Sequence, residues 1–140
     1  MRFWDSSAIV PLLVAEPGSA EAHRLLASDD RVVVWWATGI ECVAALARRE
    51  RAGPGATPAI TAALGRLRML EPSWAEIEPT PVVRRIAVRL LRTHALRTGD
   101  ALQLAAALVA ADQDEASLPF VCLDDRLSDA ARREGFSVVP

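Results

Sequence analysis

The segment Thr98–Ala111 has the sequence TGDALQLAAALVAA, with apolar residues on almost every side of a helix. A helix on the surface of a protein has a polar side, whereas this segment has Gln103 as its one polar residue after the first turn. Its apolar part is well short of the roughly 20 residues that span a bilayer. We therefore predict a helix that runs through the core of a soluble protein.

Short segments rich in β-branched and aromatic residues alternate with helical patterns along the rest of the chain. The expected strands are Arg2–Trp4, Val32–Trp35, a weak one near Trp74–Ile77, Phe120–Leu123 and Ser137–Val139. The unbroken run Val32–Val34 is typical of a parallel strand that is covered on both faces. This pattern predicts an α/β fold, a three-layer α/β/α sandwich with a mainly parallel central sheet, in one domain over residues 1–140.

Two other helical segments have apolar residues at positions i, i+3, i+4 and i+7. These residues are Ile40, Val43, Ala44 and Ala47 in one segment and Val83, Ile86, Ala87 and Leu90 in the other. We expect each stripe to be the buried face of its helix. The sequence Gly53-Pro54-Gly55 is expected to separate two helices rather than two domains.

The composition is that of an ordinary globular domain. The chain has 140 residues, 51% of them hydrophobic and 24% charged, and its net charge is −2. These values exclude collagen-like and disordered chains, and they show no polybasic character of the kind that binds nucleic acid or anionic membranes. Cys42 and Cys122 lie in apolar runs without metal-ligand spacing, which predicts reduced core thiols in a cytoplasmic protein with no signal peptide.

Acidic residues follow several of the expected strands and open the buried helix. They are Asp5 after the first strand, Glu41 in the first turn after the second, Asp100 at the start of the buried helix, and Asp124 and Asp125 after the fourth strand. In an open parallel sheet, ligands bind beyond the carboxyl ends of the strands. We therefore expect these carboxylates at one edge of the sheet.

Each acid also has an ordinary local interpretation. Thr38 and Glu41 have the spacing of a capping box, in which each side chain binds the other residue's backbone N–H. Asp100 would be favoured by the helix dipole behind a Thr98 cap. The remaining alternatives are a turn for Asp5-Ser6-Ser7 and a helix cap for Asp124 or Asp125.

Taken together, the acids indicate a metal site. Three or four close carboxylates repel one another unless a cation lies among them. Oxygen ligands favour Mg²⁺ or Mn²⁺, whereas zinc is expected with Cys and His. Such ions make a nucleophile of water and stabilise the attacking and leaving oxygens of a phosphodiester. A nuclease or a metal-dependent phosphatase would fit, although the chain lacks a Gly-rich loop for phosphate.

The motifs around these acids resemble those of PIN-domain ribonucleases and, within them, the VapC-like toxins of bacterial toxin–antitoxin pairs. The resemblance covers essentially the whole chain and agrees in order and spacing. It is carried by Asp5–Val10 (DSSAIV), Glu41 with Thr38, Thr98–Ala107 (TGDALQLAAA), Phe120–Leu127 (FVCLDDRL) and the ending Ala130–Val138 (AARREGFSV).

This resemblance implies metal-dependent endonucleolytic cleavage of RNA that leaves a 5′ phosphate and a 3′ hydroxyl. Asp5, Glu41 and Asp100 would be the core ligands of Mg²⁺ or Mn²⁺, and Asp124 would bind a second ion or its water. Asp125 would be a helix cap or an auxiliary ligand. The family usually has Thr or Ser two residues before its fourth acid, whereas this chain has a cysteine there.

Several neighbouring residues are candidates for supporting roles. Arg97 and Arg126 flank the third and fourth acids and are candidates for binding a substrate phosphate. Gln103 lies one turn after Asp100 and would contact either a metal water or backbone groups. His94 falls on the apolar stripe of its helix, so we interpret it as structural.

The family also implies partners, namely RNA, a small antitoxin protein and a second copy of the chain in a homodimer. The helices around Gly53-Pro54-Gly55 resemble the arm on which antitoxins bind, with Leu64, Leu67 and Met69 as possible apolar contacts or core residues. Trp4 and Trp35 are expected in the core, whereas Trp36 and Trp74 lie near element ends, where stacking on RNA bases is possible.

Other functions are compatible with the same motifs. One is a PIN-like binding module without activity, and another is a housekeeping nuclease that processes RNA. A third is the metal-dependent phosphatase, which the carboxylates alone would permit. No base-reading code is visible that would identify the RNA.

Overall fold

The computed structural model describes residues Met1–Pro140 and has five parallel strands in the order β3-β2-β1-β4-β5. The strands are β1 (Arg2–Trp4), β2 (Val32–Trp35), β3 (Ala75–Ile77), β4 (Phe120–Val121) and β5 (Val138–Val139). In the register, Phe3 pairs with Val33 on one side and with Phe120 on the other. All five predicted strands are present, although β4 ends two residues earlier than expected.

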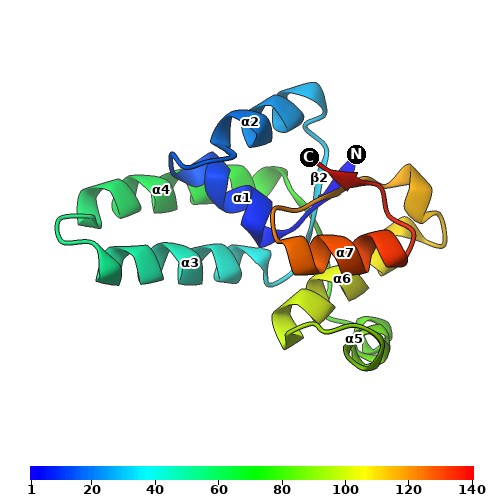
Figure 1. The fold of residues 1–140 in the computed structure, drawn as a ribbon. Helices are drawn as coiled ribbons and strands as arrows, with labels where there is room; N and C mark the ends of the chain where they lie inside the picture. The colour runs from blue at the N-terminus through cyan, green and yellow to red at the C-terminus, as the bar shows by residue number, and fades with distance from the viewer.

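Helices cover both faces of this sheet, as Figure 1 shows. The helices are α1 (Ser6–Leu13), α2 (Ser19–Ser28), α3 (Thr38–Ala52), α4 (Thr57–Leu70), α5 (Pro81–Thr93), α6 (Thr98–Ala111) and α7 (Asp125–Arg133), with short 3₁₀ helices η1 (Glu71–Ser73) and η2 (Glu115–Ser117). Two apolar clusters lie on opposite faces of the sheet, one with residues of α1–α4 and the other with residues of α5–α7. The predicted three-layer α/β/α sandwich is confirmed.

Alternation along the strands supplies both clusters. Phe3 and Val33 face α5–α7, whereas Trp4 and Val34 face α1–α4. Phe3 also stacks on Phe120 with ring centroids 5.4 Å apart. Because successive side chains of a strand point to opposite faces, a strand covered on both sides is apolar throughout, as β2 is.

Helix α6 lies in the core as predicted. Its buried residues are Ala101, Gln103, Leu104, Ala105, Ala106, Ala107 and Ala111, and it packs against α5, β2 and β3. Alanine at so many positions lets the helix approach the sheet and α5 closely, which fixes the position of Asp100 in its first turn. No helix in the chain combines the length and the apolar character needed to cross a membrane.

The stripe predicted to be buried in α3 is wrong. Ile40 and Val43 are 60% and 43% exposed, and the buried residues of this helix are Thr38, Cys42 and Leu46. The helix packs on α1 and α4 through this second row, which is less regularly apolar because it begins with a threonine. The corresponding stripe of α5 is confirmed, with Val83, Ala87 and Leu90 buried and Ile86 partly buried.

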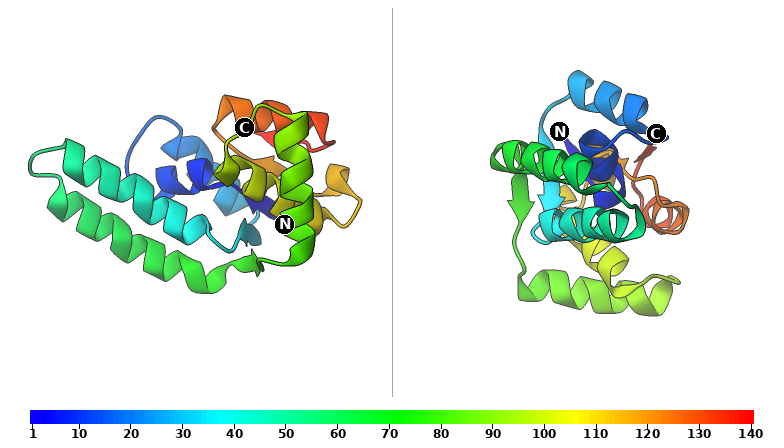
Figure 2. Two further views of the ribbon diagram at one scale, coloured as in Figure 1. Left: turned by 90° about the horizontal axis from the view of Figure 1, so that it is seen from below. Right: turned by 90° about the vertical axis from the view of Figure 1, so that its left-hand side faces the viewer.

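Helices α3 and α4 run side by side and project away from the sheet as a hairpin, as Figure 1 and Figure 2 show. The turn between them contains Gly53-Pro54-Gly55, and Gly55 has a φ of 77°, in the left-handed region that favours glycine. One end of α3 therefore lies at the carboxyl edge of the sheet, and the other lies at the tip of the hairpin.

Candidate active site

Asp5 leaves β1 directly into α1 at the carboxyl edge of the sheet. Its side chain caps α1, because Oδ2 accepts a hydrogen bond of 2.9 Å from the backbone N–H of Ser7. The residue is only 4% exposed, and burial raises the pKa of its carboxyl group above the usual range. The predicted turn for Asp5-Ser6-Ser7 is thus real, and the same turn fixes a buried carboxylate at the sheet edge.

Glu41 points toward Asp5 from the first turn of α3. The hydroxyl of Ser6 donates a hydrogen bond of 2.9 Å to Oε2, and the amide Nε2 of Gln103 donates one of 3.1 Å to the same oxygen. Burial raises the pKa of Glu41, and the charges of Asp5 and Asp100 add to that rise against the lowering effect of these two hydrogen bonds. The Glu41 carboxylate is therefore held by donors from two other helices.

This arrangement excludes the capping box suggested by the sequence. Helix α3 starts at Thr38, and no side chain caps it. The hydroxyl of Thr38 instead accepts a hydrogen bond of 3.1 Å from Gln103, so that Thr38 helps to orient the amide that binds Glu41. Gln103 thus acts on the acid itself, not on the backbone.

Asp100 and Asp124 complete the edge. Asp100 is partly exposed in the first turn of α6, and its pKa is raised first by burial and then by the charge of Asp124. The Thr98 cap is not formed, since α6 begins at Thr98 itself and has no side-chain cap. Asp124 is exposed and caps α7 through a 2.8 Å bond from the N–H of Leu127 to Oδ1.

The cap of α7 decides between the two acids that follow β4. The sequence allows either to cap the helix, and the structure gives the capping bond to Asp124, with Asp125 as the first residue of α7. Asp125 lines a hollow beside the acids together with Arg97 and Arg126. The charges of these two arginines lower the pKa of Asp100, which partly offsets its burial.

All four predicted acids line one pocket of about 470 Å³. They are Asp5, Glu41, Asp100 and Asp124, and Ser6, Ser7, Arg48 and Arg97 share the lining. No three acidic, histidine or cysteine side chains converge closely enough to hold a metal ion as they stand. The donor chemistry nevertheless suits a hard divalent cation, because carboxylate oxygens are the ligands such ions prefer, and burial and neighbouring acids raise the pKa values of Asp5, Glu41 and Asp100, an effect that a cation among them would oppose.

These observations can be compared with known proteins. A family model described as the PIN domain matches residues 2–133. The chain belongs to the PIN-domain family. Two curated relatives are each 34% identical to it over 141 aligned residues, which cover 99% of this chain and 94% of the relative. They are ribonuclease VapC45 and ribonuclease VapC49 from two strains of Mycobacterium tuberculosis.

Two solved structures have the same fold. PAE2754 from Pyrobaculum aerophilum is 22% identical, with a TM-score of 0.62 over 92% of this chain and 83% of that chain. FitAcB from Neisseria gonorrhoeae is 17% identical, with a TM-score of 0.65 over 100% of this chain and 97% of that chain. At these identities the two structures support the PIN fold.

Cys122 of this PIN domain occupies the position where the family usually has Thr or Ser. Its thiol lies 3.8 Å from Oδ2 of Asp5 and 3.5 Å from the backbone oxygen of Asp124. Burial raises the pKa of the thiol to about 12, so it remains a neutral and weak donor. The hydroxyl of Ser7 adds a connection here, since it accepts a 2.9 Å hydrogen bond from the N–H of Leu123.

Two features of the site do not follow from the sequence pattern. Arg48 lines the acid pocket from α3. Its spacing of seven residues from Glu41 places both on one face of the helix, and this spacing is the signal that could have identified Arg48. Ser6 is next to Asp5 in the chain, yet its hydroxyl binds Glu41. His94 lies outside the acid pocket, where its Nε2 is 2.7 Å from Oε1 of Glu134, in line with the predicted structural role.

Proposed function

We propose that this PIN domain is a Mg²⁺- or Mn²⁺-dependent endoribonuclease and the toxin of a toxin–antitoxin pair. The observation that carries the proposal is the pocket shared by Asp5, Glu41, Asp100 and Asp124. The proposal is supported by sequence similarity, since 99% of this chain aligns at 34% identity with proteins named as ribonucleases. The resemblance of the motifs to VapC-like toxins adds the toxin role. The buried, unpaired cysteines fit a cytoplasmic location.

The acids divide into ligands and the groups that orient them. Asp5, Glu41 and Asp100 would hold the metal, and Asp124 would bind a second ion or its water. A bound divalent ion would supply a water of lowered pKa and stabilise charge on the oxygens of a phosphodiester. Ser6 and Gln103 both donate to Oε2 of Glu41, which favours the ionised carboxylate and leaves Oε1 free to bind a ligand.

Two arginines are placed to bind the substrate. Arg97 and Arg126 share a hollow with Asp100 and Asp124, and both are exposed. A guanidinium group binds a phosphate through two parallel hydrogen bonds, which suits a phosphodiester held beside acids. We therefore assign RNA phosphate binding to Arg97 and Arg126.

The antitoxin would bind the hairpin of α3 and α4. Met69 near the end of α4 is 82% exposed and offers an apolar contact, and Leu64 is partly buried. Leu67, the third apolar candidate on this helix, is 2% exposed and belongs to the core. The contact surface for an antitoxin is therefore smaller on α4 than the sequence suggested.

The homodimer would use the face of α3 that the fold leaves uncovered. Ile40 and Val43 of α3 are 60% and 43% exposed, and Trp36, two residues before the helix, is 46% exposed; exposed large apolar side chains often mark an interface. Trp36 contacts Trp35 edge-on, with ring centroids 6.4 Å apart. A dimer through this face would bury the stripe that the sequence pattern predicts to be buried.

The test is RNA cleavage by antitoxin-free protein with Mn²⁺, Mg²⁺ or EDTA. We expect wild type to cleave a mixed RNA pool with either ion and not with EDTA, and Asp5→Asn and Asp100→Asn to be inactive. Asp30→Asn is the matched control, since Asp30 is exposed and lines no part of the acid pocket. Equal activity in all variants would indicate contamination or a different site. Turnover of a phosphomonoester with RNA intact would favour the phosphatase.

A further inference from the structure

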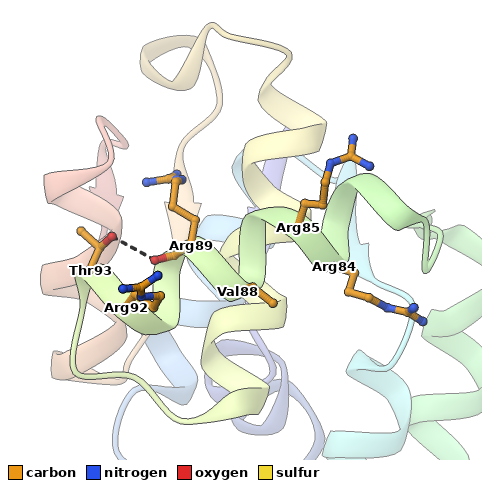
Figure 3. Close-up of a pocket in the computed structure, with 6 residues that line it drawn as sticks. All are labelled: Arg84, Arg85, Val88, Arg89, Arg92 and Thr93. Atoms are coloured by element: carbon orange, nitrogen blue, oxygen red, sulfur yellow. Dashed lines mark hydrogen bonds between the residues drawn. The ribbon is translucent and has the colours of Figure 1, made fainter.

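The outer face of α5 carries arginines around a shallow hollow of about 770 Å³. Its lining consists of Arg84, Arg85, Val88, Arg89, Arg92 and Thr93. Figure 3 shows the side chains of Arg85 and Arg89 on one side of the helix and that of Arg84 on the other. Arg89 forms a two-fold ion pair with Glu134, with distances of 3.1 and 2.7 Å. Arg84, Arg85 and Arg92 have no hydrogen-bond or ion-pair partner.

This hollow adjoins a series of others that leads to the acids. Thr93 also lines a second hollow, which contains Arg126 and Arg133. Arg126 in turn lines the hollow of Arg97 and Asp100, and these two residues line the acid pocket as well. From α5 to the acid pocket, each hollow therefore shares at least one lining residue with the next.

Arginines occur in every hollow of the path. Arg97, Arg126 and Arg133 are exposed, and Asp100, Asp124 and Asp125 beside the first two form the acidic end of the path. Asp129 binds Arg132 at 3.2 Å, and Glu134 binds Arg89 and His94. In a chain whose net charge is −2, unpaired arginines concentrated along one path indicate an anionic ligand.

We propose that these hollows form a path for single-stranded RNA, in which α5 binds phosphates several nucleotides from the scissile bond. The inference rests on the proposed nuclease function and adds a substrate-binding surface to it. Arg85 and Arg92 are seven residues apart, about 10 Å along a helix, so they can bind different phosphates of one strand. Val88 between them offers an apolar contact for a ribose or base.

An acidic protein segment is the competing ligand for such a surface. It fits less well, because the path ends at Asp5, Glu41, Asp100 and Asp124, and the divalent ion proposed for this pocket gives it a role toward a phosphodiester and none toward an acidic peptide. A phosphodiester strand would use both the arginines and the acid pocket. The arginines would bind its backbone along the path, and the bond would be cut in the acid pocket. The continuity of the hollows therefore favours RNA.

The test compares Arg85→Gln/Arg92→Gln with the control Arg51→Gln/Arg68→Gln. The control arginines are exposed, have no ion pair and lie on the α3–α4 hairpin outside the path. Both doubles remove the same charge, and Gln has a helix propensity close to that of Arg. Binding of fluorescent oligouridylates of 4 and 16 nucleotides is measured in EDTA over a series of salt concentrations, and cleavage of the RNA pool is measured with Mn²⁺.

We expect the path variant to bind the 16-mer about three- to tenfold more weakly than the control does, because two exposed arginines no longer bind phosphates. The slope of log affinity against log salt should fall by about 1.4, or about 0.7 for each phosphate that is no longer neutralised. Affinity for the 4-mer and the cleavage rate at saturating RNA should match those of the control. Circular dichroism and thermal melting confirm that both doubles are folded.

Equal affinity of the two doubles for the 16-mer would overturn the path while RNA cleavage by wild type still supports the nuclease. Wild type that is folded yet cleaves no RNA would refute the proposed function instead. A polyglutamate peptide serves as the protein-like probe. If the path variant loses affinity for polyglutamate and not for the 16-mer, the surface binds acidic protein and the RNA path is wrong.

Discussion

Asp5 and Asp124 follow neighbouring strands, β1 and β4, and make the same local interaction in different surroundings. Each caps the helix after its strand by accepting a backbone N–H bond, at 2.9 Å for Asp5 and 2.8 Å for Asp124. Asp5 is buried, whereas Asp124 is exposed. The comparison shows that capping alone does not explain why Asp5 is buried. An exposed aspartate caps a helix equally well, whereas burial raises the pKa of the Asp5 carboxyl group.

The pocket accordingly has two regions. The inner region contains Asp5 and Glu41, held by Ser6, Ser7 and Gln103. The outer region contains Asp100 and Asp124 with Arg97 and Arg126, which are open to solvent or partly so. We infer that the inner region holds the metal together with Asp100 of the outer region, and that the rest of the outer region meets the substrate. The following experiments test this division.

The largest effect is expected for Asp5→Asn. Asn caps a helix as well as Asp does, so the local structure should be kept while a charged ligand is lost. RNA cleavage should fall by more than about a hundredfold, beyond what the loss of a supporting residue costs. Single-turnover cleavage with Mn²⁺ measures the change. Activity within about threefold of wild type would remove Asp5 from the metal site.

Gln103→Leu should have the next largest effect. It removes the amide that donates to Glu41 and Thr38, and it keeps a side chain of similar size in the core. We expect cleavage to fall by about 10- to 100-fold, as for other residues that orient a metal ligand. The concentration of Mn²⁺ needed for half-maximal rate should rise at the same time. A change in RNA affinity alone would contradict this positioning role.

The contribution of three site acids to the stability of metal-free protein should fall as the pH rises. Asp5, Glu41 and Asp100 have raised pKa values in the folded state, so they favour folding below their unfolded values of about 3.8 to 4.5. That contribution is lost as the pH rises through their folded pKa values, above about pH 4. Mn²⁺ at a hundred times its Kd should restore about 2.7 kcal/mol. Urea unfolding of wild type and Asp5→Asn over a pH series, with and without Mn²⁺, measures both effects, and the same pH dependence in the two metal-free proteins would contradict the first.

Variants of Asp124 can distinguish its capping role from a role in catalysis. Asp124→Asn should keep the cap of α7 and change the free energy of unfolding by less than about 0.5 kcal/mol, whereas Asp124→Ala should cost about 1 kcal/mol. Both should reduce cleavage to the same extent if the charge is what matters. Urea unfolding and cleavage assays on the two variants give the comparison, and full activity in Asp124→Asn would assign this residue to capping alone.

The smallest effect concerns an acid outside the pocket. Arg89 and His94 hold the pKa of Glu134 below its usual range, so its ion pairs stabilise the fold above an unfolded pKa of about 4.5. This contribution is lost as the pH falls through the folded value. Glu134→Gln should therefore weaken the acid dependence of thermal unfolding and leave cleavage unchanged. Reduced cleavage by this variant would link α7 and α5 to the chemistry.

Much of the fold was accessible from the sequence, because strands and a core helix buried on all sides are continuous apolar segments. The segments Val32–Trp35 and Thr98–Ala111 are examples. The buried face of α3 was not accessible. Its most regular stripe contains Ile40 and Val43, and only the packing of α1 and α4 on the other side shows which row is covered.

For the site, the sequence predicted the position of the acids but not the residues that bind them. The acids follow from their positions at strand ends, and the structure brings all four to one pocket. The partners of Glu41 did not follow, because Ser6 and Gln103 are 35 and 62 residues away in the chain. The capping-box pattern with Thr38 was a plausible local solution that these distant donors replace.

The order of the strands has a consequence for how the protein is made. The first strand to leave the ribosome, β1, lies at the centre of the sheet, and its neighbour β4 is translated more than a hundred residues later. The pocket needs both Asp5 and Asp124. A nascent chain therefore cannot assemble the pocket until Asp124 has left the ribosome, so the acid site stays incomplete while everything between β1 and β4 is synthesised.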